Sequence, residues 1–258
     1  MLRPRIIPCL LVKNRGLVKT QKFSSPKYVG DPINAVKVFN EKQVDELIVL
    51  DIDASAQGRE PDYTMIRNLA AECRMPLCYG GGVKTVEQAA KIIGLGVEKV
   101  AVSSAAVESP ELISKMAEVL GNQSVVVVMD VRQRTPGGEY VVCIRNGGTA
   151  VARDPVELAR DVASRGAGEI VVNSIDRDGV MNGYDTDLIA AVRNAVSVPI
   201  TAVGGAGSIR DIAQLIARFG IIGAAAGSLF VFKGPFRAVL ISYPGPEEKA
   251  SIVSLVPT

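Results

Sequence analysis

The chain has 258 residues, 48% of them hydrophobic, so it is long enough to bury a large core in one α/β barrel or in two small domains. Its 29 basic and 27 acidic residues leave a formal net charge of +2, which gives no electrostatic reason to expect a nucleic-acid or membrane partner. The sequence has no histidine, which excludes Ser-His-Asp and Cys-His catalysis and histidine-ligated metal sites; we expect no metal and no cofactor.

Eight short apolar runs follow one another along the chain without polar alternation, as expected for strands buried on both faces of a parallel sheet. Amphipathic stretches such as DPINAVKVFNEKQV, TVEQAAKIIGLG and DPVELARDVASRG separate them and predict helices, several ending at glycine. Eight such units predict a (βα)8 TIM barrel with its functional site at the carboxyl ends of the strands. The expected strands are residues 6–11, 47–50, 76–79, 100–102, 125–130, 170–173, 200–203 and 222–226.

The two halves of the chain repeat one another. PLCYGGGVKTVEQAAKIIGLG from Pro76 reappears as PITAVGGAGSIRDIAQLIARFG from Pro199, and ELIVLDIDA from Glu46 reappears as EIVVNSIDR from Glu169. This repeat favours a barrel built from two duplicated half-barrels over the alternative, an open doubly wound sheet. We expect a single domain over residues 1–258, with residues 244–258 as a terminal helix or tail.

The N-terminal apolar run, residues 6–12, is too short for a signal-peptide core with a cleavage site, and no stretch reaches about 18 apolar residues. We therefore expect a cytoplasmic protein. The cysteines show no Cys-X-X-Cys spacing and lie in or beside apolar runs, which indicates buried free thiols. They are Cys9, Cys73, Cys78 and Cys143.

Glycine-rich turns follow the third and the seventh expected strand, as GGGVKTVEQ and GGAGSIRD. Glycine lets the backbone approach an anion, the amides of a helix N-terminus attract phosphate, and Thr85 with Gln88 and Ser208 with Asp211 are spaced as N-caps with their partners. Two such cradles in register predict a phosphorylated ligand with a phosphate at each end, with tight turns as the alternative reading. The candidate phosphate-binding residues are Gly81, Gly82, Ser103, Ser104, Asp178, Gly179, Gly204, Gly205, Gly227 and Ser228.

Residues 12–30 are rich in lysine and glycine and are expected to form a mobile lid over the mouth of the barrel. Lys19 within this segment is a candidate contact for the bound anion. A solvated surface lysine is the alternative.

The chain resembles one known family almost from end to end. The resemblance lies in RIIPCLLVKN, GDPINAVKVFNEKQVDELIVLDIDAS, PLCYGGGVKTVEQA, EKVAVSSAAV, GAGEIVVNSIDRDGVMNGYD and PITAVGGAGS. These segments are similar to the HisF family, the cyclase subunit of imidazole glycerol phosphate synthase. The resemblance implies a HisH-like glutaminase partner that frees ammonia from glutamine, and passage of that ammonia through the barrel. It also implies a reaction that splits a two-phosphate ribulosyl formimino intermediate into imidazole glycerol phosphate and an aminoimidazole carboxamide ribotide.

The resemblance further implies two catalytic aspartates, at the ends of the first and the fifth strand. Asp130 occupies the second of these positions, but Leu11 occupies the first, and a leucine can neither accept nor donate a proton. Asp130 and Lys19 remain the candidate catalytic residues. Further departures from the family pattern are Asn14 for an aspartate, Asp53 for a threonine and Val231 for a histidine.

Four charged residues stand directly before expected strands, so their side chains can converge at the amino-terminal end of the barrel. They match the charged gate through which, in the family, ammonia arrives from the glutaminase. A structural salt-bridge plug is the alternative, although a closed ionic ring is costly to desolvate. These residues are Arg5, Glu46, Lys99 and Glu169.

The charged gate residues are present, whereas one of the two catalytic aspartates is missing. This combination predicts a subunit that conveys ammonia but does not carry out the cyclisation. HisF-like proteins of surface-polysaccharide (lipopolysaccharide) pathways look like relatives of this kind; they are thought to supply a sugar amidotransferase that converts an acetamido into an acetamidino group. The alternatives are a genuine cyclase in histidine biosynthesis, in which Asp130, Asp53 or a lid residue compensates for Leu11, and a phosphosugar-binding or isomerase barrel without a glutaminase. The retained cradles suggest a ligand that switches on the glutaminase.

Overall fold

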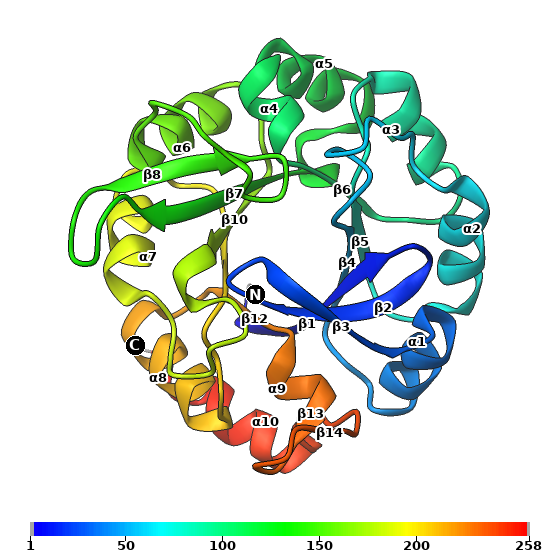
Figure 1. The fold of residues 1–258 in the computed structure, drawn as a ribbon, viewed down its shortest axis with the longest axis vertical. Helices are drawn as coiled ribbons and strands as arrows, with labels where there is room; N and C mark the ends of the chain where they lie inside the picture. The colour runs from blue at the N-terminus through cyan, green and yellow to red at the C-terminus, as the bar shows by residue number, and fades with distance from the viewer. Residues whose placement is uncertain (1–2, 257–258) are drawn as a thin grey trace.

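Eight parallel strands close into a barrel in a computed structural model, which describes residues 3–256 (Figure 1). The last barrel strand pairs in parallel with the first, from Arg5 opposite Gly223 to Pro8 opposite Ala226. This closure confirms the TIM barrel and excludes the open sheet. The barrel strands are β1 (Arg5–Lys13), β4 (Leu47–Asp51), β5 (Leu77–Gly80), β6 (Lys99–Val102), β7 (Val125–Gln133), β10 (Glu169–Ser174), β11 (Ile200–Val203) and β12 (Gly223–Ala226).

The expected helices form a ring around the barrel (Figure 1). Their starts follow from the sequence, because Thr85 with Gln88 and Ser208 with Asp211 each form the predicted reciprocal capping box. The long helices are α1 (Pro32–Glu41), α2 (Tyr63–Glu72), α3 (Val86–Ile93), α5 (Glu111–Leu120), α6 (Pro155–Ser164), α7 (Thr186–Arg193), α8 (Ile209–Phe219) and α10 (Pro246–Val253). Helix α10 accounts for part of the expected terminal segment; residues 1–2 and 257–258 of the expected domain lie outside the described residues.

The segment expected as a lid differs from the prediction, because it is a regular antiparallel hairpin. Strands β2 (Gly16–Gln21) and β3 (Ser24–Gly30) extend β1 outward, with Leu11 opposite Val18. Both connecting turns hold two consecutive residues with positive φ, Asn14–Arg15 and Lys22–Phe23, and paired positive φ values are typical of tight hairpin turns. The mobility of this segment stays a prediction.

Smaller elements that were not predicted lie in the loops, most of them after the carboxyl ends of the barrel strands. They are β8 (Tyr140–Ile144), β9 (Thr149–Ala150), β13 (Phe232–Lys233), β14 (Ala238–Val239), the short helices α4 (Ser104–Glu108) and α9 (Ser228–Val231), and the 3-10 turns η1 (Asn122–Ser124) and η2 (Ile175–Arg177).

Two apolar layers hold the fold. A large one packs the outer faces of the strands against the helices, and a smaller one fills the barrel with side chains such as Ile7, Cys78 and Val171. All four cysteines are free thiols; Cys73 is only half-buried, whereas the other three are buried as predicted. Within residues 3–256, no helix has the length and apolar character needed to cross a membrane.

Candidate functional site

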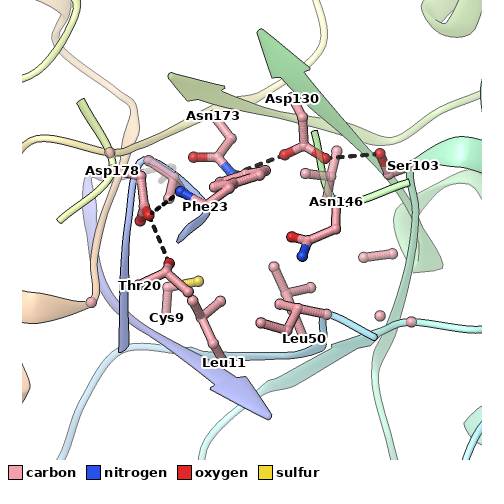
Figure 2. A pocket seen from close by; sticks show the side chains of 18 of the residues that line it. Cys9, Leu11, Thr20, Phe23, Leu50, Ser103, Asp130, Asn146, Asn173 and Asp178 are labelled. Atoms are coloured by element: carbon pink, nitrogen blue, oxygen red, sulfur yellow. Dashed lines mark hydrogen bonds between the residues drawn. The ribbon is translucent and has the colours of Figure 1, made fainter. Parts of the chain in front are cut away.

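A pocket opens at the carboxyl ends of the barrel strands, with Leu11 and Asp130 on opposite walls (Figure 2). Leu11 comes from β1 and Asp130 from β7, as their positions in the two halves predict. The structure brings all ten candidate phosphate-binding residues to the wall of this one pocket, together with Lys19. Glycine turns that are far apart in the sequence therefore face a common space.

Asp130 is the titratable centre of this pocket. Its side chain is buried, and its carboxylate accepts hydrogen bonds from Asn173 Nδ2 at 2.9 Å and from Ser103 Oγ at 3.2 Å (Figure 2). Burial raises the pKa of Asp130 to about 6, and the two hydrogen bonds only partly offset the effect. A carboxyl group that titrates near neutrality is suited to exchange a proton with a bound ligand.

Leu11 belongs to an apolar part of the wall. It lies opposite Leu50 in the register of β1 with β4, and both pack with Val203 on the apolar cluster inside the barrel. The Leu11 side chain itself offers neither a proton donor nor a proton acceptor at this position.

The two other carboxylates on the described pocket wall are already engaged with the backbone. Asp51 accepts hydrogen bonds from the amides of Asp53 and Ala54 at 3.2 and 3.1 Å. Asp178 accepts from Thr20 Oγ1 at 2.7 Å and from the Phe23 amide at 3.1 Å, which ties the β2–β3 hairpin to the loop after β10. Both carboxylates therefore hold the loops around the pocket, although burial raises the pKa of Asp178 as it does that of Asp130.

Asp53 is a candidate substitute for the missing carboxylate. Its side chain lies outside the pocket wall and forms an ion pair with Lys13 at 3.4 Å. The other two departures are also remote from the chemistry: Asn14 lies exposed in the turn before β2, and Val231 is buried in α9.

Lys19 is buried, so the alternative of a solvated surface lysine is wrong. Its Nζ donates a hydrogen bond to the carbonyl of Cys9 at 2.6 Å, and no carboxylate of residues 3–256 forms an ion pair with it. Burial lowers the pKa of Lys19. The amine lies directly against Gly227, where any side chain would collide with it. A buried amine that has no carboxylate within ion-pair distance and lies beside a candidate phosphate cradle is suited to bind an anion, which would favour its protonated form.

The glycines of the two repeated turns are required by backbone packing. Gly81 and Gly204 both have positive φ, and a Cβ at either would overlap the carbonyl of a neighbouring strand end, Asp51 or Ser174. The tight-turn reading is therefore correct for these positions. Phosphate binding by the same turns stays a prediction, since both roles need the same close backbone approach.

The four charged residues expected at the gate converge at the amino-terminal end of the barrel. Arg5 pairs with Glu46 and, through Nη2, with Glu169 Oε1 at 2.7 Å; Lys99 Nζ lies 2.8 Å from both carboxylates. Thr201 Oγ1 also donates to Glu169 at 2.5 Å.

The charges of this cluster stabilise one another. Burial alone would raise the pKa of Glu169, but Arg5 and Lys99 outweigh it and hold that pKa well below its usual range. The same pairing raises the pKa of Lys99 against the opposing effect of burial. Between this ionic cluster and the pocket the barrel interior is apolar, a medium that favours neutral ammonia over ammonium.

Asn173 is a pocket residue that the sequence analysis did not single out. It lies beside Asp130 because β10 pairs with β7 in a register that sets these two residues opposite each other. Its Nδ2 donates a hydrogen bond to the Asp130 carboxylate, and its buried Oδ1 has no hydrogen-bond partner among the described residues. The available signal was a polar residue at the end of the apolar strand EIVVN.

Comparisons with known proteins match the whole barrel. A model of the family described as "Histidine biosynthesis protein" matches residues 5–237. A Vibrio vulnificus protein, provisionally named imidazole glycerol phosphate synthase subunit hisF3, is 55% identical over 99% of this chain and 98% of its own length. A Pseudomonas aeruginosa protein, provisionally named subunit hisF2 of that synthase, is 55% identical over 95% of this chain and 97% of its own length. Imidazole glycerol phosphate synthase subunit HisF of Hyphomonas neptunium is 42% identical over 90% of this chain and 91% of its own length.

Proposed function

This chain belongs to the HisF family of histidine biosynthesis proteins, and from that premise we propose that it conveys ammonia from a glutaminase to a separate acceptor enzyme. The acceptor is a sugar amidotransferase of surface-polysaccharide synthesis, which converts an acetamido into an acetamidino group. The complex works in the cytoplasm.

The glutaminase partner is HisH-like and docks at the amino-terminal end of the barrel. The ionic cluster of Arg5, Glu46, Lys99 and Glu169 supports this, because a closed ring of buried charge is a costly way to seal a barrel that apolar packing would seal as well. The apolar interior beyond the cluster supports passage of the neutral amine toward the pocket.

One observation carries the proposal that the acceptor is a separate enzyme. Leu11 faces Asp130 across the pocket, and the other carboxylates of the described wall, Asp51 and Asp178, are bonded to backbone amides or to the β2–β3 hairpin. The pair of carboxylates that the family resemblance implies for the cyclisation is therefore incomplete here, since a leucine stands at one of the two positions.

The pocket nevertheless keeps a ligand of its own, a small molecule with two phosphates. The buried amine of Lys19 forms no ion pair with a carboxylate of the described residues and lies against Gly227, which supports an anion in that position. With the catalytic pair incomplete, this ligand acts as a regulator that switches on the glutaminase.

A genuine cyclase in histidine biosynthesis is the second candidate. The names of the relatives favour it, since all refer to imidazole glycerol phosphate synthase. The pKa of Asp130, about 6, also suits proton transfer. Two of the three relatives at 55% identity carry the numbers hisF2 and hisF3, which fits additional copies with a separate role, whereas the third is named HisF without a number.

The deciding experiment gives the purified chain the ribulosyl formimino substrate and an ammonium salt, and follows imidazole glycerol phosphate. We expect no turnover by the natural chain and a gain of about 100-fold or more over background in Leu11→Asp, the range of general acid–base catalysis. Leu50→Asp, which adds a carboxylate to the neighbouring strand of the same wall, is the matched control and should gain nothing. Turnover by the natural chain at the rate of an ordinary family member would refute the proposal.

A further inference from the structure

Two hairpins at the carboxyl-terminal end of the barrel form what we call the rim surface, residues 16–30 and 232–240. The first, β2–β3, supplies Lys19, Thr20 and Phe23 to the pocket wall. The second, β13–β14, follows α9, whose first residue Ser228 lines the same pocket. In Figure 1 the blue β2–β3 hairpin lies inside the ring of helices, and β13–β14 lies beside α9 and α10. The rim surface therefore extends outward from the mouth of the pocket.

The rim surface exposes large apolar side chains. Phe236 is 94% exposed, Tyr28 67% and Leu240 53%. Together with Val239 they make up four of the seven exposed large hydrophobic residues among those the structure describes. Exposed large apolar side chains concentrated on two hairpins are typical of a contact surface.

Contacts at the base of the hairpins hold the rim surface in place. Phe232 packs between two cations, with Lys27 Nζ 5.6 Å and the Arg237 guanidinium 4.9 Å from its ring centre. Arg237 Nη2 also donates a hydrogen bond to the carbonyl of Gly179, a pocket-wall residue, at 3.1 Å. The two hairpins thus form one surface that is fastened to the pocket rim.

The charge of the rim surface has a single sign. Its two segments contain five basic residues and no aspartate or glutamate, although the whole chain is balanced at 29 basic and 27 acidic residues. Lys22 and Lys233 are exposed and carry no side-chain ion pair in the described structure. Such a surface is complementary to a partner with an acidic rim around an apolar socket.

We propose that the rim surface docks the acceptor enzyme, with Phe236 in an apolar socket and with acidic groups of the acceptor opposite Lys22 and Lys233. This inference rests on the proposed function. Ammonia that leaves the pocket into open water becomes protonated and is no longer a nucleophile, so the acceptor must cover the mouth while it receives the amine. The rim surface lies at the carboxyl-terminal end of the barrel beside that mouth, so it belongs to the face that such an acceptor would cover.

The test uses the full chain, its glutaminase and the purified sugar amidotransferase from the same organism. Binding of the amidotransferase is measured by calorimetry, and transfer is followed as glutamine amide nitrogen in the acetamidino product. Phe236→Asp should weaken binding at least tenfold, as expected for removal of an interface anchor. It should also abolish glutamine-supported transfer while added ammonium still supports the acceptor. The pair Lys22→Glu with Lys233→Glu should slow association and remove its dependence on salt.

The matched controls lie on α5, outside the rim surface. Val119→Asp replaces a side chain that is 62% exposed, and Lys115→Glu reverses an exposed charge. Both should bind and transfer as the natural chain does.

The outcomes separate this inference from the proposed function. Normal binding and transfer by Phe236→Asp would refute docking of the acceptor on the rim surface but would not affect the proposed ammonia-conveying role. No binding and no transfer by the natural chain, with cyclase turnover present, would overturn both. Two other outcomes would also overturn the inference. If the natural chain self-associates and Phe236→Asp does not, the rim surface binds a second copy of the chain. If the natural chain attaches to anionic vesicles but not to the amidotransferase, the rim surface binds a membrane.

Discussion

Replacing Asp130 by asparagine should make the protein more stable at neutral pH. Burial raises the folded-state pKa of Asp130 from 3.8 to about 6. The folded protein therefore holds a proton that the unfolded chain has already released, and ionisation destabilises the fold progressively as the pH rises from about 4 to about 6. Two pKa units correspond to a destabilisation of about 3 kcal/mol in the free energy of unfolding. This destabilisation is complete above pH 7 and is less than about 1 kcal/mol at pH 4.

The assay is urea denaturation of the natural chain and of Asp130→Asn at pH 7.5 and at pH 4. The amide keeps the size of the side chain and one acceptor oxygen for Asn173, so the gain should reflect the lost buried charge. Asp187→Asn, at a side chain that is 87% exposed, controls for the removal of one negative charge and should change stability by about 0.5 kcal/mol or less. Equal unfolding midpoints at pH 7.5, or a gain of the same size at both pH values, would refute a buried, costly carboxylate.

The remaining predictions concern the ionic cluster and the anion site. Glu169→Gln should lower the free energy of unfolding by about 3 kcal/mol at pH 7, because it leaves Arg5 and Lys99 undercompensated. The pKa of Glu169 is depressed, so its ionised form stabilises the fold above the pKa of an unfolded glutamate, and this stabilisation disappears as the pH falls. The stability difference between Glu169→Gln and the natural chain should therefore shrink in acid. An unchanged difference would argue against the pairing. Lys19→Met should lower the affinity for a bis-phosphate analogue about tenfold or more in calorimetric titration, since it removes a charge-assisted hydrogen bond to the anion. Lys22→Met, on the same hairpin, should leave that affinity unchanged. Equal affinities of both variants would place the anion elsewhere.

The barrel was predictable because its signals are local. Strands buried on both faces are continuous apolar runs, and residues 200–203 were predicted with the bounds that β11 has. Helix starts were predictable from a cap and its partner three residues later, as at Ser208 and Asp211. The convergence of Arg5, Glu46, Lys99 and Glu169 also followed, since residues before parallel strands share one end of a barrel.

The hairpins were missed for a physical reason. In GLVKTQKFSSPKYVG the residues that favour strands are interrupted by lysines, serines and a proline, and the turns Asn14–Arg15 and Lys22–Phe23 lack the glycine that usually accompanies positive φ. Their pairing is stabilised from outside, as Asp178 holds Thr20 and the Phe23 amide from the other half of the chain.

The amino-acid sequence by itself determined the order of the elements, the duplication, and the replacement of an expected carboxylate by Leu11, because each is written in residue type and spacing along the chain. Only the tertiary structure decided that Lys19 is buried without an ion pair to a described carboxylate, that Asn173 donates a hydrogen bond to Asp130, and that Asp178 accepts from Thr20 and the Phe23 amide. These relations depend on which strands become neighbours when the barrel closes and on the register in which they pair. Contacts between residues so distant in sequence leave no local pattern that could reveal them.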